Sequence, residues 1–203
     1  TWENNDSNYN VGIGNYSMDA AMNGALYNTG VGYGSLSGLL SGQQNTVVGY
    51  QAGDSINTGS WNILMGVNTG GSITGGGQNT FIGSGAGAAL TTGNYNVAIG
   101  AGAFDAAAFV ETGNVAIGQD AMGAVNEDDD GSDVDNNIAI GYGALLGGSL
   151  ADVDRQLTGN IAIGKDAMNA TGAYGSVGQV AIGEDALGAL TNGGYNTAVG
   201  YRA

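Results

Sequence analysis

Apolar and polar positions follow one short block that recurs along the whole chain. Each block begins with Asn, continues with three apolar or small residues and ends with Gly. The copies are Asn10–Gly14, Asn28–Gly32, Asn45–Gly49, Asn62–Gly66, Asn79–Gly83, Asn96–Gly100, Asn114–Gly118, Asn137–Gly141, Asn160–Gly164 and Asn196–Gly200, and an eleventh, Gln179–Gly183, begins with Gln. Successive block glycines are 18, 17, 17, 17, 17, 18, 23, 23, 19 and 17 residues apart. So many copies in one phase predict a repeat protein.

Each block predicts a short strand, because a few residues rich in Val, Ile and Thr are too few for a helix. Three residues after each block glycine stands a small residue, often followed by a large apolar one, as at Ser35 and Leu36. We interpret that segment as a second short strand, which a polar turn such as 91–95 follows. Two strands and two corners in a 17-residue unit make one coil of a parallel solenoid. We therefore predict an all-β parallel β-solenoid of about eleven 17-residue coils, as a single domain over residues 1–203.

The repeated Gly and Asn have separate predicted roles. Gly adopts positive φ without steric cost, so the block glycines predict corners of the coil. We expect the block Asn to stack on its copies in neighbouring coils, with each side chain bonded to the backbone or to the next amide. Coils stacked about 4.8 Å apart would form a rod on the order of 50 Å long.

Two rows of side chains decide which side of the strand is buried. The residue just before each block glycine, from Ile13 to Val199, is always sizeable and apolar, and we assign this row to the interior. Side chains alternate along a strand, so the residue before it should point outward, although no member of that row is polar. So long an apolar stripe predicts contact with other copies, and three rods around an axis are the expected arrangement; a coil that turns this row partly inward is the alternative. The predicted oligomer interface comprises Val47, Leu64, Phe81, Ala98, Ala116, Ala139, Ala162, Ala181 and Ala198.

Composition narrows the class of protein and partner. The 203 residues include 41 Gly and no Pro, Cys or His, and the net charge is −15. Three basic residues against 18 acidic ones argue against nucleic acid as a partner, since phosphate binding depends on Lys and Arg. No stretch approaches the ~18 apolar residues of a membrane span, so no membrane insertion is expected. Without His or Cys, the commonest general base and the thiol nucleophile are missing, and we predict no enzymatic activity.

The two 23-residue intervals predict loop insertions at 126–135 and 147–156, and the first insertion contains six acidic residues. Oxygen donors at alternate positions followed by Gly131 match the first half of a calcium loop, but the twelfth position is Asn137, where a bidentate Glu belongs. We expect a hydrated acidic loop, and a calcium site is the alternative; no other cofactor is predicted. The candidate calcium ligands are Asn126, Asp128, Asp130, Asp133 and Asp135.

Aromatic residues recur beside the blocks, either just before the Asn or just after the Gly. Tyr and Trp combine a flat apolar ring with a polar tip, so a platform for glycans is one hypothesis. The alternative is a ladder of stacked rings along the coil edges. We expect the ladder, because residues at one repeat position contact each other in a solenoid. The residues of the candidate platform are Tyr33, Tyr50, Trp61, Tyr95 and Tyr142.

The block sequences also resemble a known repeat. Asn96–Gly100 and Asn114–Gly118, both NVAIG, resemble the head repeat of YadA-like trimeric autotransporter adhesins. Tyr195–Ala203 and Leu90–Tyr95 are similar to repeats of phage tail fibres and related surface proteins. The resemblance covers essentially the whole chain. It implies a trimeric, left-handed parallel β-roll with a role in adhesion or host-receptor recognition.

We therefore expect an extracellular adhesion element, at a cell surface or in a virion tail fibre, that recognises a host receptor or glycan. The alternative is a structural subunit of an extracellular filament or sheath, which buries its apolar row against neighbours and binds no receptor. Ice binding by a flat face would need a regular Thr row. Thr occupies one repeat position only at Thr29, Thr46, Thr80 and Thr197, where most other copies have Val or Ile.

Overall fold

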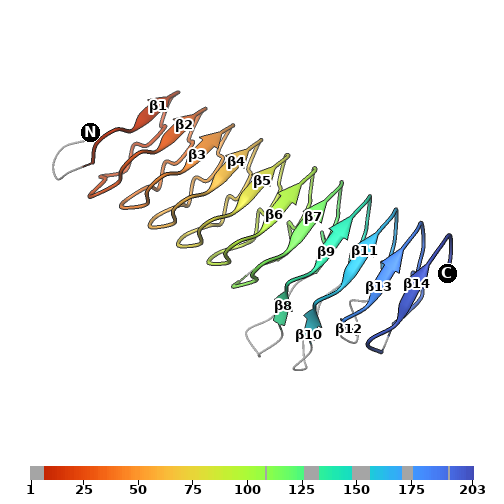
Figure 1. Cartoon of the computed structure of the whole chain (residues 1–203). Coiled ribbons are helices and arrows are strands. Elements are labelled where there is room, and N and C mark those ends of the chain that lie inside the picture. Colours follow the sequence, from red (N-terminus) through yellow and green to blue (C-terminus); the bar gives the residue numbers. More distant parts are fainter. Residues whose placement is uncertain (1–6, 108, 126–132, 148–155, 171–175, 192) are drawn as a thin grey trace.

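One parallel sheet runs the length of the structure and takes one strand from each block (Figure 1). The computed structural model describes residues 7–107, 109–125, 133–147, 156–170, 176–191 and 193–203. In order along the sheet, the strands are β1 (Val11–Ile13), β2 (Thr29–Val31), β3 (Thr46–Val48), β4 (Ile63–Met65), β5 (Thr80–Ile82), β6 (Val97–Ile99), β7 (Val115–Ile117), β9 (Ile138–Ile140), β11 (Ile161–Ile163), β13 (Val180–Ile182) and β14 (Thr197–Val199). The predicted all-β parallel solenoid is confirmed, whereas trimeric assembly and the left hand of the coil stay predictions.

The strands pair in one unbroken register. Leu64 pairs with Val47 on one side and with Phe81 on the other. The register also holds across the 23-residue intervals, where Ala139 pairs with both Ala116 and Ala162. The extra residues of the long intervals are therefore accommodated outside this sheet.

A second, smaller parallel sheet lies in the two 23-residue intervals and in the 19-residue interval that follows them. Its strands are β8 (Asp133–Asp135), β10 (Gln156–Thr158) and β12 (Ser176–Val177), in the order β12-β10-β8. The predicted insertion 126–135 thus ends in strand β8, and the insertion 147–156 ends where β10 begins. Residues 126–132 and 148–155, which make up most of both insertions, lie outside the described part of the chain.

The block asparagines form a buried ladder along the rod, as predicted. Asn45 donates from Nδ2 to Asn28 Oδ1 and to the Gly59 carbonyl, both at 2.9 Å. Its Oδ1 accepts the backbone N–H and the Nδ2 of Asn62, at 3.0 and 3.1 Å. The same pattern continues through the buried residues Asn28, Asn45, Asn62, Asn79, Asn96, Asn114, Asn137 and Asn160. Both N–H groups and the oxygen of each interior amide are satisfied, so the ladder costs no unpaired buried polar group.

The middle residue of each sheet strand points into the coil, which overturns the predicted assignment of faces. The strand residue just before each block glycine, assigned above to the interior, is instead partly or fully exposed from Ile13 to Val199. The block Asn is buried, and the residue two positions later shares its face because strands have a period of two. The row predicted as an outward oligomer interface is therefore inside, and that prediction was wrong. Val47, Leu64, Phe81, Ala98, Ala116, Ala139, Ala162 and Ala181 are buried, and Ala198 is half-buried.

The segment after each block glycine is a turn, so the second short strand predicted there is also wrong. Its large apolar residues have left-handed backbones, with φ of 54° at Leu36 and 57° at Phe104, and both side chains are buried. The turns still bond coil to coil, as in the 3.2 Å hydrogen bond from Leu36 N–H to the Ala52 carbonyl. Left-handed conformation costs a non-Gly residue roughly 1–2 kcal/mol. Burying a Leu or Phe side chain gains about 1.5–3 kcal/mol, which offsets that cost.

Two positions on each coil share the volume of the core: the middle strand residue and the residue six positions later. A large strand residue is matched by Gly in the pairs Val47/Gly53, Leu64/Gly70 and Phe81/Gly87. Gly or Ala in the strand is matched by Met, Leu or Phe in the pairs Gly12/Met18, Gly30/Leu36, Ala98/Phe104, Ala116/Met122, Ala139/Leu145, Ala162/Met168 and Ala181/Leu187. The interior therefore has room for one large side chain per coil from this pair of positions. Within the described residues, no helix is long and apolar enough to cross a membrane.

Candidate functional site

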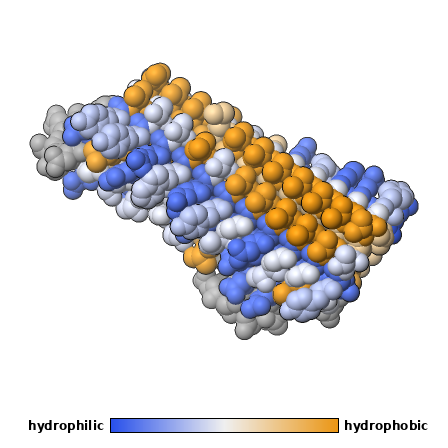
Figure 2. All heavy atoms as spheres, in the orientation of Figure 1, coloured by the Kyte–Doolittle hydropathy of each residue, from blue (hydrophilic) through white to orange (hydrophobic). Residues whose placement is uncertain are grey.

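The outer side of the long sheet is an apolar face. We define it as the first and third residues of the eleven sheet strands, of which 18 are Val, Ile or Met and four are Thr. None of these side chains is buried, and at mid-rod Ile63 and Met65 expose 44% and 45% of their surface. Figure 2 shows the face as an orange band that paler side chains interrupt toward the N-terminal end, with polar side chains along its borders.

The sequence builds this face through strand alternation. Asn62 and Leu64 point into the coil. Ile63 and Met65, each the next residue along the strand, therefore point outward. Parallel pairing in one register repeats the pattern on every coil, and the face carries no charged residue. Apolar patches of this extent are uncommon on monomeric soluble proteins and mark contact surfaces.

Sequence reasoning missed these face residues because it used side-chain size to choose the interior. Large Ile and Val before the block glycine suggested a core, whereas small Ala and Gly in the middle row suggested an outer surface. A ladder of block Asn side chains was already expected. The ladder is buried, and because side chains alternate along a strand, the middle row lies on the same inner side. That alternation was the signal that could have identified the face.

The aromatic residues fall into two rows on opposite sides of the sheet strands. The leading row is the residue just before each block Asn or Gln, and it includes Trp61 and Tyr95. The trailing row is the residue just after each block Gly, and it includes Tyr33, Tyr50 and Tyr142. The five residues of the predicted glycan platform therefore do not form one patch. All five side chains are exposed, by 45–59%.

Ring stacking occurs at the N-terminal end of both rows. Tyr33 and Tyr50 stack with ring centroids 5.3 Å apart and planes at 11°. In the leading row, Tyr9 and Tyr27 stack at 5.0 Å and 4°. The expected ladder of rings is thus found where aromatic residues occupy one position on adjacent coils.

The predicted calcium loop is described only at its end. Asn126, Asp128 and Asp130 lie outside the described residues. Asp133 and Asp135 lie on β8, where Asp135 Oδ1 accepts the Thr112 backbone N–H at 2.6 Å. Asn137, at the twelfth position, belongs to the buried ladder and donates to Asn114 Oδ1. Within the described residues, no group of three or more Asp, Glu, His or Cys side chains could hold a metal ion, so the calcium site stays a prediction.

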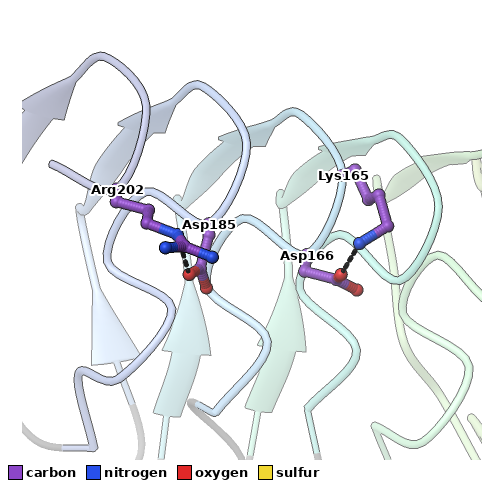
Figure 3. Close-up of polar contacts among 4 residues, drawn as sticks. All are labelled: Lys165, Asp166, Asp185 and Arg202. Carbon is purple, nitrogen blue, oxygen red and sulfur yellow. Dashed lines mark hydrogen bonds and ion pairs between the residues drawn. The ribbon is translucent and has the colours of Figure 1, made fainter.

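Charged side chains gather on the corner that follows the C-terminal strands (Figure 3). Lys165 Nζ lies 2.5 Å from Asp166 Oδ2, and this hydrogen bond raises the pKa of the Lys165 ammonium. Arg202 Nε lies 3.5 Å from Asp185 Oδ2. Both pairs are accessible to solvent, and such surface pairs contribute little to stability.

Two half-buried carboxyls on the turns are electrostatically unfavourable. Burial raises the pKa of Asp54. Burial also raises the pKa of Asp105, and the nearby Asp120 carboxylate adds to that effect. The carboxylates of Asp105 and Asp120 both lie beside Gly102: a Cβ on Gly102 would lie 2.7 Å from Asp120 Oδ1 and 3.4 Å from Asp105 Oδ2.

Comparison with known proteins does not identify a family for this chain, so its structure alone defines the class of protein. The chain matches no family model, no curated protein and no solved structure. The fold and its face define a parallel β-solenoid with one apolar, uncharged side. The two aromatic rows border the sheet that carries this side.

Proposed function

We propose that this chain is an extracellular fibre element that assembles with copies of itself through the apolar face and adheres to a host receptor or glycan through its remaining surface. The observation that carries the proposal is the uncharged face of 22 side chains on the eleven strands. Burial of apolar surface contributes roughly 25 cal/mol per Å², so a face of this length favours association strongly.

A second copy is the occupant that fits the face best. The face repeats in one register and has no charged residue along its whole length, so an identical face matches it in spacing. A closed arrangement hides the face from water in every copy, as homo-oligomers with point-group symmetry do. We expect three copies around one axis, in keeping with the adhesin-like and fibre-like block sequences.

Light scattering on a size-exclusion column tests the assembly. We expect a discrete trimer of about 60 kDa, three times the chain mass of 20.0 kDa. A Met65→Lys/Ile82→Lys variant should dissociate it, because each interface would bury two uncompensated charges per copy. Ser84→Lys, an exposed position outside the face, is the matched control and should stay trimeric. A monomeric wild type would overturn the assembly, and a dimer would overturn its stoichiometry.

Adhesion needs its own measurement. Fluorescently labelled oligomer should bind whole cells saturably in flow cytometry, and unlabelled oligomer should compete. An intact oligomer that binds no cell type would contradict the adhesive role and favour a structural filament subunit. Open-ended polymers in light scattering would point the same way.

A further inference from the structure

The leading row contains a regular stretch in which aromatic and amide side chains alternate. Its five consecutive positions are Tyr27, Gln44, Trp61, Gln78 and Tyr95. All five have left-handed backbones, with φ between 57° and 61°. The side chains therefore leave successive coils from equivalent positions. All five are exposed, the three aromatic ones by 53%, 57% and 59%.

The alternation sets the distance between the aromatic rings. Parallel strands lie about 4.8 Å apart, so residues two coils apart are separated by about 9.6 Å. The Tyr9 and Tyr27 rings, one coil apart, lie 5.0 Å from each other, which agrees with one such step. Tyr27, Trp61 and Tyr95 thus recur at intervals of about two strand separations, and one face of the Tyr27 ring is stacked on Tyr9.

The intervening glutamines separate these rings. A structural ladder would be best served by an aromatic residue on every coil, as in the stacked pair Tyr33 and Tyr50 of the trailing row. Among the ring pairs found in the described residues, none includes Trp61 or Tyr95. The faces of these two rings are therefore not covered by another ring.

The surroundings of the stretch are neutral. The residues that precede its five members are Leu26, Gln43, Ser60, Gly77 and Asn94, and the block Asn follows each. No basic residue occurs before Arg155, so this part of the surface offers nothing to pair with a carboxylated or sulfated ligand. The stretch ends at Gly113, where the leading row loses its aromatic side chain.

We propose that Tyr27, Gln44, Trp61, Gln78 and Tyr95 bind an extended, neutral β-1,4-linked polysaccharide laid along the rod. In such a chain every second sugar presents the same face, and the disaccharide length matches the spacing of the rings. The C–H faces of those sugars stack on the rings of Trp61 and Tyr95 and on the face of Tyr27 that Tyr9 leaves free. The Gln44 and Gln78 amides, between the rings, supply donors and acceptors for hydroxyl groups.

This inference deepens the adhesive role proposed above and rests on it only for its biological purpose. It also replaces the predicted glycan platform: Trp61 and Tyr95 remain, Tyr27 and the two glutamines join them, and Tyr33, Tyr50 and Tyr142 are left out.

Titration calorimetry with cellohexaose and chitohexaose tests the proposal, with α-linked maltohexaose as the geometric control. We expect saturable binding of at least one β-linked hexasaccharide and none of maltohexaose. Trp61→Gln should weaken binding roughly three- to tenfold, the effect of one lost ring contact, and Trp61→Gln/Tyr95→Gln should abolish it. Gln is already present at positions 44 and 78 with the same φ, so both variants should fold and melt like the wild type. Tyr50→Gln in the trailing row should bind normally.

The outcomes separate this proposal from the assembly. An intact wild-type oligomer that binds neither β-linked hexasaccharide overturns the glycan site and leaves the assembly standing. Undiminished binding by the double variant, or loss of binding in Tyr50→Gln alone, also overturns the site. A monomer that binds cellohexaose through Trp61 supports the site and overturns the assembly.

Discussion

The ring of Phe81 occupies the space that a side chain on Gly87 would need. A Cβ on Gly87 would collide with three atoms of that ring, Cε2, Cδ2 and Cζ. In the next coil the arrangement is reversed, with Ala98 in the strand and Phe104 at the turn. Gly87 and Phe104 have nearly the same φ, 60° and 57°, so one backbone serves both packings.

Exchanging the partners on one coil should therefore preserve the fold. Phe81→Ala alone should destabilise the protein by about 3–5 kcal/mol through the cavity it leaves. Gly87→Phe alone should destabilise it by about 1–3 kcal/mol or more through overpacking. The double variant Phe81→Ala/Gly87→Phe copies the adjacent coil and should recover to within about 1.5 kcal/mol of the wild type. Urea denaturation of the four proteins measures the coupling.

Gly85→Ala is the control for backbone strain. Gly85 has a φ of 70°, and a Cβ there would meet no atom within 4 Å. It should lose only the roughly 1–2 kcal/mol of a left-handed Ala, and Gly87→Ala should lose more. If the stability losses of Phe81→Ala and Gly87→Phe simply added in the double variant, positions 81 and 87 would not share one space in the core.

The repeat phase was readable from sequence because the block glycine has no substitute. Gly49 approaches the backbone of Gly66 in the next coil so closely that a Cβ would overlap its carbonyl oxygen. Such contacts leave a strict mark in the sequence at every coil. The ladder position is nearly as strict, with Asn in ten copies and Gln179 in the eleventh, since each side chain from Asn10 to Asn160 bonds to an amide side chain one coil away. Both features of the fold were therefore predictable.

The faces of the strand were not assigned correctly because size alone does not report burial in so narrow a coil. Ala98 is buried although it is small, because Phe104 fills the adjacent space. Ile99 is large and partly exposed. The compensation between positions six residues apart is visible in the sequence, but only the folded coil shows that the two positions meet. The apolar face is therefore defined by the folded coil and not by side-chain size.

The Asn ladder should not tolerate a carboxylate at its centre. Asn62 donates from Nδ2 to Asn45 Oδ1 at 3.1 Å and to the Gly76 carbonyl at 2.9 Å. Asn62→Asp keeps the shape of the side chain but replaces the donating Nδ2 by an oxygen. As a carboxylate, that oxygen would face the Asn45 Oδ1 and the Gly76 carbonyl oxygen without a hydrogen bond to either. We expect a loss of about 3–5 kcal/mol at neutral pH, measured by thermal and urea denaturation. Asn68→Asp, an exposed Asn on the same coil, adds the same charge and should change stability by less than about 0.5 kcal/mol. Equal losses in the two variants would refute a structural role for the ladder.

Mild acidification should stabilise the fold through Asp54 and Asp105. Burial raises the pKa of both carboxyls in the folded state, so the folded protein binds protons more readily than the unfolded chain. Protonation of these two carboxyls contributes its whole stabilisation of the folded state below about pH 4, the ordinary pKa of Asp. That stabilisation is lost as the pH rises through the raised pKa values of the folded state.

Asp54→Asn and Asp105→Asn should each raise the melting temperature at pH 7 and flatten its rise between pH 7 and pH 4. Both carboxyls are only partly buried, so each effect should stay below about 1 kcal/mol. Asp19→Asn, at an exposed position, is the control: it removes one carboxyl that is not half-buried and should change the melting temperature less than either variant. Melting curves across this range that are identical for all four proteins would contradict the assignment.

One whole repeat should be removable from the middle of the rod. Deletion of residues 63–79 removes 17 residues and joins Asn62 to Thr80, which restores an intact block of Asn, Thr80, Phe81, Ile82 and Gly83. Each coil contacts only its neighbours, so the shortened protein should lose one set of interface contacts and keep its fold. We expect an unchanged β-type circular dichroism spectrum per residue and a melting temperature lower by a few degrees.

The matched control deletes 63–80, one residue more. The resulting block glycines would be 16 residues apart, shorter than any interval in the chain, and the residue after Asn62 would move to the opposite face of the strand. Phe81 would then point outward and Ile82 into the core, so we expect aggregation or a broad, weakly cooperative melt. If both deletions behaved alike, the stacking of coils would not depend on the register of the block, and strand alternation would not determine which residues form the apolar face.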